Sequence, residues 1–164
     1  MRRNYLSIPD DAGRDVLGRP VVNSVQRFHG GGYLQCMDRR RISSAMPWEQ
    51  TFGYSRAVVV GDRVFVSGTA PVMPDGEDPP TDAYGQARRC LEIVLAALDE
   101  AGAGAEHVVR TRIYVTSPDH IDEALRAHGE VFRNVRPATT GIVVTALFDP
   151  RWLVEIEADA IIGG

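Results

Sequence analysis

The sequence predicts an α+β domain of order ββαβαββ, in which two helices cover one face of a mixed sheet. In two segments, apolar residues recur at spacings of three and four, which is typical of helices that bury one side. Each of these segments is followed by residues rich in β-branched side chains, which favour strands. At 164 residues, with 44% hydrophobic and 24% charged residues, the chain has the length and composition of one globular domain.

The first two strands are predicted at residues 57–60 (AVVV) and 63–68 (RVFVSG). Both segments are rich in valine, and only Gly61 and Asp62 separate them. A two-residue connection containing glycine is typical of a tight hairpin, so we expect an antiparallel pair.

The first helix is predicted after a loop at residues 73–81 (MPDGEDPPT), with Thr81 as its N-cap and Gly102 as its end. Its apolar stripe consists of Ala87, Cys90, Leu91, Val94, Leu95 and Leu98. The second helix follows Ser117 and Pro118, a capping residue and a proline suited to the first turn. Its stripe consists of Ile121, Leu125, His128 and Phe132, and we expect His128 to be a half-buried structural residue.

A strand is predicted between the two helices, at residues 107–116, and two more at 141–147 and 152–162. In the first of these, alternation places Val109, Thr111, Ile113 and Val115 on one face and Arg110, Arg112 and Tyr114 on the other. In the last strand, Glu155, Glu157 and Asp159 share a face. If these two strands are neighbours, Arg110 and Arg112 can pair with those acids. Such a face is either a solvated set of charge pairs or a crevice holding a half-buried general base.

Residues 1–42 show no sustained period of helix or strand, so we predict an N-terminal arm followed by a folded domain at 43–164. Eight of the arginines lie within the first 50 residues, three of them consecutively from Arg39 to Arg41. A short basic run of this kind is more often a solvated segment or a partner contact than a nucleic-acid site.

Composition argues against several functional classes. The net charge of −4 makes nucleic acid an improbable partner, and no apolar run reaches the ~20 residues needed to span a membrane. Basic residues at the start are followed by no apolar segment of the signal-peptide kind, so we expect a cytoplasmic protein. All 18 basic residues are arginine, which excludes Schiff-base chemistry on this chain. The four histidines lack metal-ligand spacing and no dinucleotide motif is present, so we expect neither a metal nor a cofactor.

Several segments, matched in order and spacing, resemble the RidA/YjgF family of small trimeric proteins. They are GYSRAVVVGDRVFVSGTAP from Gly53, LDEAGA from Leu98, RTRIYVT from Arg110, HGEVF from His128, RPATT from Arg136 and LVEIEADA from Leu153. The resemblance covers about Ser43 to Ile162. It implies a chorismate-mutase-like fold, a homotrimer with clefts between subunits, and hydrolysis of small reactive enamines and imines such as 2-aminoacrylate.

The resemblance also implies site residues. Matching motifs point to Tyr54, Ser67, Gly68 and Glu155, whereas the position of the family's carboxylate-binding arginine is occupied by Thr139. We therefore expect a ligand that is uncharged or differently charged at that end, unless Arg136 or Arg151 reaches into the cleft. The other interpretation is that Thr139 and Thr140 are simply good strand residues and that the cleft has lost its original role.

We expect a RidA-like hydrolase or deaminase whose substrate is not the usual 2-imino acid. Catalytic roles are assigned to Glu155 and Thr139, and contacts with the small-molecule substrate to Tyr54, Ser67, Gly68, Thr140 and Arg136. The alternative is a non-catalytic small-molecule-binding or regulatory trimer. Ribonuclease activity, a label that the family has carried, is disfavoured by the acidic net charge and the lack of a catalytic histidine pair.

Overall fold

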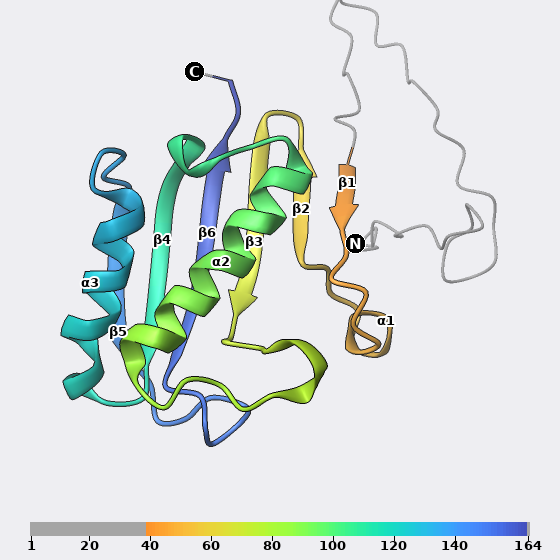
Figure 1. Cartoon of the computed structure of the whole chain (residues 1–164). Helices are drawn as coiled ribbons and strands as arrows, with labels where there is room; N and C mark the ends of the chain where they lie inside the picture. Colours follow the sequence, from red (N-terminus) through yellow and green to blue (C-terminus); the bar gives the residue numbers. More distant parts are fainter. Residues whose placement is uncertain (1–38, 164) are drawn as a thin grey trace, which may run out of the picture. The chain divides into compact units, whose positions relative to one another are not determined.

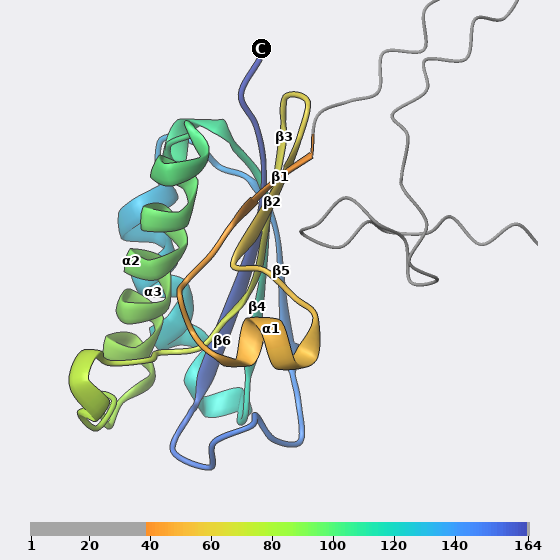
Figure 2. The same cartoon turned by 90° about the vertical axis from the view of Figure 1, so that its right-hand side faces the viewer.

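The computed structural model of the chain describes residues 39–163. Within this range a six-stranded sheet has the order β1-β2-β3-β6-β4-β5. The two long helices, α2 (Ala83–Ala101) and α3 (Ile121–Phe132), lie on the same side of it (Figure 1, Figure 2). The predicted α+β class, with two helices on one face of a mixed sheet, is confirmed. We call the face opposite α2 and α3 the open face.

The strands are β1 (Arg39–Ile42), β2 (Ala57–Val60), β3 (Arg63–Thr69), β4 (Val108–Val115), β5 (Ala138–Val143) and β6 (Val154–Ile161). Strands β4 and β5 pair in parallel, and the other neighbours are antiparallel. The predicted hairpin is present, because β2 and β3 are joined through Gly61 and Asp62. Short 3₁₀ turns lie at Pro74–Gly76, Ala105–His107 and Pro118–His120.

Strand β1 corrects the predicted domain boundary, because residues 39–42, assigned to the arm, pair with β2 as part of the sheet. Only Ile42 of this strand is buried, so a run of exposed arginines concealed its strand pattern. The guanidinium of Arg40 donates hydrogen bonds to the carbonyl oxygens of Glu100 (3.0 Å) and Ala101 (2.8 Å) at the end of α2. The rest of the predicted arm, residues 1–38, lies outside the described residues.

A short helix that the sequence did not predict, α1 (Trp48–Phe52), connects β1 to β2. Its Glu49 is buried and accepts hydrogen bonds from the hydroxyl groups of Ser43 and Ser44 and from the Ser44 backbone N–H. These bonds lower the pKa of Glu49 against the effect of burial, so the carboxylate fixes the chain where it leaves β1.

Helix α2 begins one residue later than predicted. Its N-cap is Asp82 rather than Thr81, and the Asp82 carboxylate accepts a hydrogen bond from the Gly85 N–H at 2.8 Å. The helix ends at Gly102, whose φ of 85° suits glycine, as predicted. Its stripe is confirmed, since Cys90, Leu91, Val94 and Leu98 are all buried against the sheet.

Two predicted core positions are wrong. Val109 is 44% exposed because the register between β4 and β6 shifts between Val108 and Arg110, which puts Val108 into the core instead. Leu125 is 41% exposed, and the buried residues on either side of it are the alanines Ala124 and Ala127, on a helix that packs beside α2. No helix of the described range is both long enough and apolar enough to cross a membrane.

Candidate functional site

The centre of the open face is strand β6, which lies between β3 and β4. Its residues alternate between buried apolar side chains and the acids Glu155, Glu157 and Asp159. The predicted neighbourhood with β4 is confirmed: Arg110 lies opposite Asp159, Arg112 opposite Glu157 and Tyr114 opposite Glu155.

The three carboxylates differ in their partners. The guanidinium of Arg112 forms a close ion pair with Glu157 and lies 3.8 Å from Asp159. Glu155 faces a tyrosine instead, and within residues 39–163 no group donates a hydrogen bond to its carboxylate. Glu155 is therefore the acid of this strand that remains available to a ligand.

Gly68 on β3 allows the Glu155 carboxylate to lie directly against the backbone. A Cβ atom at position 68 would be 2.1 Å from Oε1 of Glu155, which is far inside contact distance. The register of β3 against β6 also shifts between Val66 and Thr69, so Gly68 lies in an irregular part of the strand. Glycine at this position is explained by the close approach of the carboxylate.

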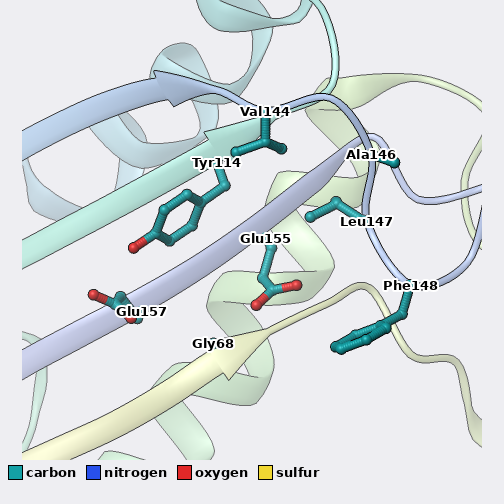
Figure 3. Close-up of a pocket in the computed structure, with 8 residues that line it drawn as sticks. All are labelled: Gly68, Tyr114, Val144, Ala146, Leu147, Phe148, Glu155 and Glu157. Carbon is teal, nitrogen blue, oxygen red and sulfur yellow. The ribbon is translucent and has the colours of Figure 1, made fainter.

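A pocket of about 450 Å³ surrounds Glu155 on the open face (Figure 3). Besides Glu155, its lining consists of Gly68, Tyr114, Glu157 and the apolar residues Val144, Ala146, Leu147 and Phe148. The last four belong to the loop between β5 and β6, part of which (144–147) was predicted to be strand. Phe148 is fully exposed at the rim. The pocket is thus acidic at its base and apolar along one wall.

Arg56, which was not among the predicted site residues, holds the backbone of β3 at Gly68. Its guanidinium donates hydrogen bonds to the carbonyl oxygens of Gly68 (2.8 Å) and Ser67 (3.4 Å). The Ser67 hydroxyl donates to the carbonyl oxygen of Ser55 at 2.8 Å, which ties the same part of β3 to the segment just before β2. The sequence signal for Arg56 was its place two residues after Tyr54, within the GYSRA segment.

Burial is the main influence on the pKa of Glu155, and it raises the pKa because a desolvated carboxylate is less stable. The positive charge of Arg56 lowers the pKa, while the negative charge of Glu157 raises it. Burial also raises the pKa of the Tyr114 phenol, and Glu157 adds to that effect. A carboxylate with a raised pKa in a pocket is a candidate general base.

Thr139, the position matched to the family's arginine, lies on the other side of the sheet from Glu155. Its Oγ1 is 3.0 Å from Oγ1 of Thr111 on β4 and 3.5 Å from Nε2 of His128 on α3, and both of these partners are buried. As expected, His128 is a buried residue with a hydrogen-bond partner, since its Nε2 is 2.9 Å from the Thr111 hydroxyl. One chain alone therefore does not bring Thr139 and Glu155 together.

The remaining predicted residues also lie outside the pocket lining. Thr140 is exposed on the edge strand opposite Arg112, and Arg136, with a φ of 54°, precedes β5 at its far end from the pocket. Tyr54 precedes β2 and is 41% exposed. Of the seven predicted site residues, the structure of a single chain places Gly68 and Glu155 in the pocket, with Ser67 adjacent in sequence to Gly68.

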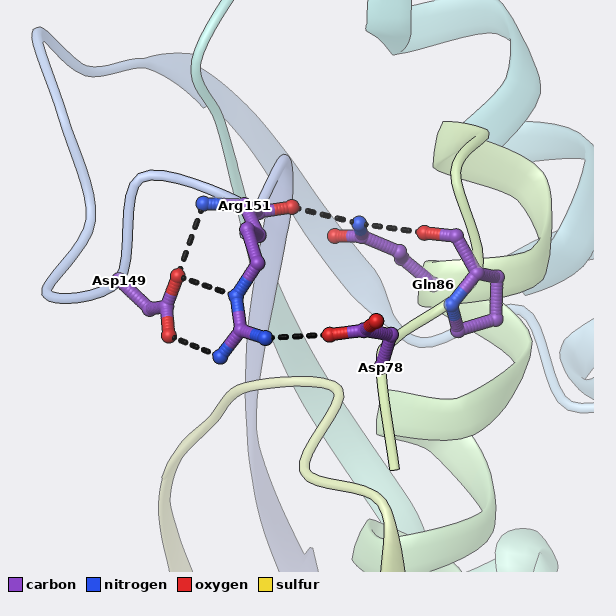
Figure 4. Close-up of polar contacts among 5 residues, drawn as sticks. Asp78, Gln86, Asp149 and Arg151 are labelled. Carbon is purple, nitrogen blue, oxygen red and sulfur yellow. Dashed lines mark hydrogen bonds and ion pairs between the residues drawn. The ribbon is translucent and has the colours of Figure 1, made fainter. Parts of the chain in front are cut away.

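Arg151 does not supply a cation to the pocket, because it is bound elsewhere (Figure 4). Its guanidinium pairs with Asp149 at 2.7 Å and with Asp78 at 2.5 Å, and its carbonyl oxygen accepts a hydrogen bond from the buried Gln86 side chain. The Gln86 amide oxygen in turn accepts from the Leu153 N–H. These contacts fix the end of the loop that carries Phe148.

Comparison with known proteins places this chain in a family. The sequence model described as Endoribonuclease L-PSP matches residues 46–162. The chain belongs to the RidA/YjgF family. A RutC family protein of Pyrococcus abyssi is 34% identical to it over 65% of this chain and 84% of its own length. An uncharacterised protein of Streptomyces coelicolor is 41% identical over 76% and 92%.

Solved structures agree with the RidA/YjgF assignment. A Mycobacterium tuberculosis member of the YjgF/YER057c/UK114 family is 42% identical, with a TM-score of 0.70 over 76% of this chain and all of that one. A putative endoribonuclease of Thermotoga maritima is 31% identical, with a TM-score of 0.65 over 76% of this chain and 93% of that one. The matched regions of this RidA/YjgF chain contain the pocket and both of its acids.

Proposed function

We propose that this chain is a hydrolase that deaminates small reactive imines or their enamine tautomers, with Glu155 as the general base. The observation that carries the proposal is the Glu155 carboxylate itself. It is half-buried, has a raised pKa, accepts no hydrogen bond within the described range and opens into a pocket of about 450 Å³. Membership of the RidA/YjgF family supports the same reaction class.

In this reaction, Glu155 takes a proton from water while the water oxygen bonds to the imine carbon and the nitrogen gains a proton. The resulting carbinolamine then loses ammonia as its C–N bond breaks, and the hydroxyl proton leaves as the carbonyl forms. The sum is imine plus water giving ketone or aldehyde plus ammonia. A carboxylate that is held partly out of water is a stronger base than a solvated one, which suits the first step.

Threonine at position 139, where the family has an arginine, supports a substrate other than a 2-imino acid. A hydrogen bond between charged groups contributes about 1.5–3 kcal/mol, so replacing an arginine clamp with threonine weakens carboxylate binding by roughly one to two powers of ten. Two glutamates in the pocket lining oppose an anion as well. The preferred imine therefore carries no carboxylate next to its reacting carbon.

The chain acts as a homotrimer in this proposal. The open face carries apolar side chains that a lone subunit leaves uncovered: Phe65 is 44% exposed, Ile142 38% and Phe148 fully. Such a surface is typical of an interface. Burying it between three subunits gives the pocket further walls from a neighbouring chain and can bring the partner's edge strand near Glu155.

The test is ammonia release from a panel of imines generated in solution, comprising 2-iminopropanoate from 2-aminoacrylate and neutral imines of similar size. We expect kcat/KM for the neutral imines to exceed that for 2-iminopropanoate by at least about tenfold. A clear preference for 2-iminopropanoate would contradict the substrate assignment. Absence of turnover on the whole panel would leave the non-catalytic binding trimer as the better account.

A further inference from the structure

The charged side chains that line the pocket are both acidic. They are Glu155 and Glu157. Of the two nearest cations, Arg112 is committed to Glu157 and Asp159, and Arg56 donates to the backbone carbonyls of Ser67 and Gly68. Glu155 thus presents a carboxylate that no described hydrogen-bond donor satisfies.

The walls of the pocket are aromatic and aliphatic. Figure 3 shows the Glu155 side chain between Tyr114 on one side and Phe148 on the other, with Leu147 above it. Aromatic rings beside a carboxylate form a favourable environment for a cation, because the ring faces carry partial negative charge. Val144 and Ala146 add apolar surface for the uncharged part of a ligand. Polar and apolar contacts are therefore separated within one small cavity.

We propose that this pocket selects small organic cations, protonated amines or iminium ions with an apolar substituent, by placing the cationic nitrogen at Glu155. The inference rests on the proposed function in that it names the substrate class of the same site. Protonation makes an imine carbon more electrophilic, so a pocket that favours the iminium form also favours the reacting species. A volume of about 450 Å³ suits a compound of this size.

The probe is a set of three ligands of one shape and different charge: benzylamine, benzyl alcohol and benzoate. Dissociation constants are measured at pH 7 by calorimetry on the full-length protein in its native assembly. We expect benzylamine to bind at least about tenfold more tightly than benzyl alcohol, and benzoate to bind more weakly than the alcohol.

Two variants test whether the preference for benzylamine over benzyl alcohol comes from Glu155. Glu155→Gln keeps the size of the side chain and is expected to reduce the preference for the amine over the alcohol to less than about threefold. Asp159→Asn is the matched control, since Asp159 lies on the same strand and the same face but outside the pocket lining. It is expected to keep the preference of the unmodified protein.

Three outcomes overturn the inference: benzoate binding as tightly as benzylamine, an amine preference that survives Glu155→Gln, and no detectable binding of any of the three probes. The assay needs no turnover, so it separates the two claims. A protein that hydrolyses imines but prefers benzoate refutes the cation preference alone. A protein with a Glu155-dependent amine preference and no ammonia release refutes the hydrolase alone.

Discussion

At the scale of single residues, Glu155 and Arg56 together set the protonation state of the pocket. Burial and Glu157 raise the pKa of Glu155, and Arg56 opposes them with a positive charge. Arg56 also donates a hydrogen bond to the backbone carbonyl of Gly68, and the Glu155 carboxylate lies where a Cβ of residue 68 would be. One guanidinium therefore acts on both the position of the base and its proton affinity.

Replacing Arg56 by glutamine tests this electrostatic role. Glu155 acts as a base only when ionised, so activity is lost as the pH falls through its pKa. Removing the neighbouring positive charge raises that pKa further, and the acid limb of the kcat/KM profile moves to higher pH in Arg56→Gln. Arg63→Gln, at an exposed position of the β2–β3 hairpin, serves as the control and is expected to leave the limb in place. An unchanged limb in both variants would contradict the role given to Arg56.

Gly68→Ala tests the close contact between the two strands. The new Cβ meets the end of the flexible Glu155 side chain, so the carboxylate moves and the fold is retained. We expect kcat/KM to fall by about 10²-fold, as for a catalytic group displaced by ~1 Å, with little change in the melting temperature. Gly129→Ala on α3 has no atom within 4 Å of its new Cβ and is expected to keep full activity. Full activity in Gly68→Ala would show that the position of Glu155 does not matter.

At the scale of secondary-structure elements, strand β5 is held at the sheet edge by one parallel ladder and a partly buried polar contact. All six of its residues are exposed in a single chain. The hydroxyl of Thr139 reaches Thr111 on β4, and Thr111 in turn contacts His128 on α3. The parallel register sets Thr139 opposite the buried Thr111, and this placement explains why Thr139 points toward the helices and away from Glu155.

Thr111→Val tests how much the hydrogen bond between Thr111 and His128 stabilises the fold. The substitution keeps the shape of the side chain and leaves Nε2 of the buried His128 without its 2.9 Å partner. We expect the free energy of unfolding to fall by about 1–3 kcal/mol, measured by urea denaturation. Thr139→Val, at an exposed position, should cost less. A larger loss in Thr139→Val than in Thr111→Val would contradict this order.

At the scale of the whole molecule, the open face is the surface that the proposed trimer buries. Light scattering on the purified protein should give about three times the chain mass of 18.0 kDa, independent of concentration in the micromolar range. The physical reason is the exposed apolar surface around Phe65, Ile142 and Phe148, which becomes buried on assembly. A mass of one chain at high concentration would contradict the proposed trimer.

The sequence predicted the helix and sheet layers of this fold well, because the spacing of apolar residues along a segment shows which of its faces is buried. The α2 stripe and the acidic face of β6 both follow from spacing alone, and both are present. Strand β1 was missed because three exposed arginines mask a strand whose single buried residue is Ile42. Val109 was misplaced because a register shift changes which residues face the core, and alternation cannot reveal where such a shift occurs.

The site was predictable only in part. Glu155 and Gly68 could be found because each is marked by a local motif, and the structure places them in contact. Arg56 and Phe148 could not, because their relation to Glu155 depends on chain segments far apart in sequence. The position of Thr139 could not be predicted either, because it depends on the direction of a side chain on an edge strand; in the proposed trimer, its role also depends on what a second subunit brings to Glu155.

The most direct test of the central claim compares the rate of ammonia release from one neutral imine by the unmodified protein, by Glu155→Gln and by Asp159→Asn. We expect Glu155→Gln to lose about 10²–10⁴-fold in kcat/KM, the usual contribution of a general base, while Asp159→Asn stays close to the unmodified rate. Equal rates for Glu155→Gln and the unmodified protein would contradict the claim that this carboxylate activates the water.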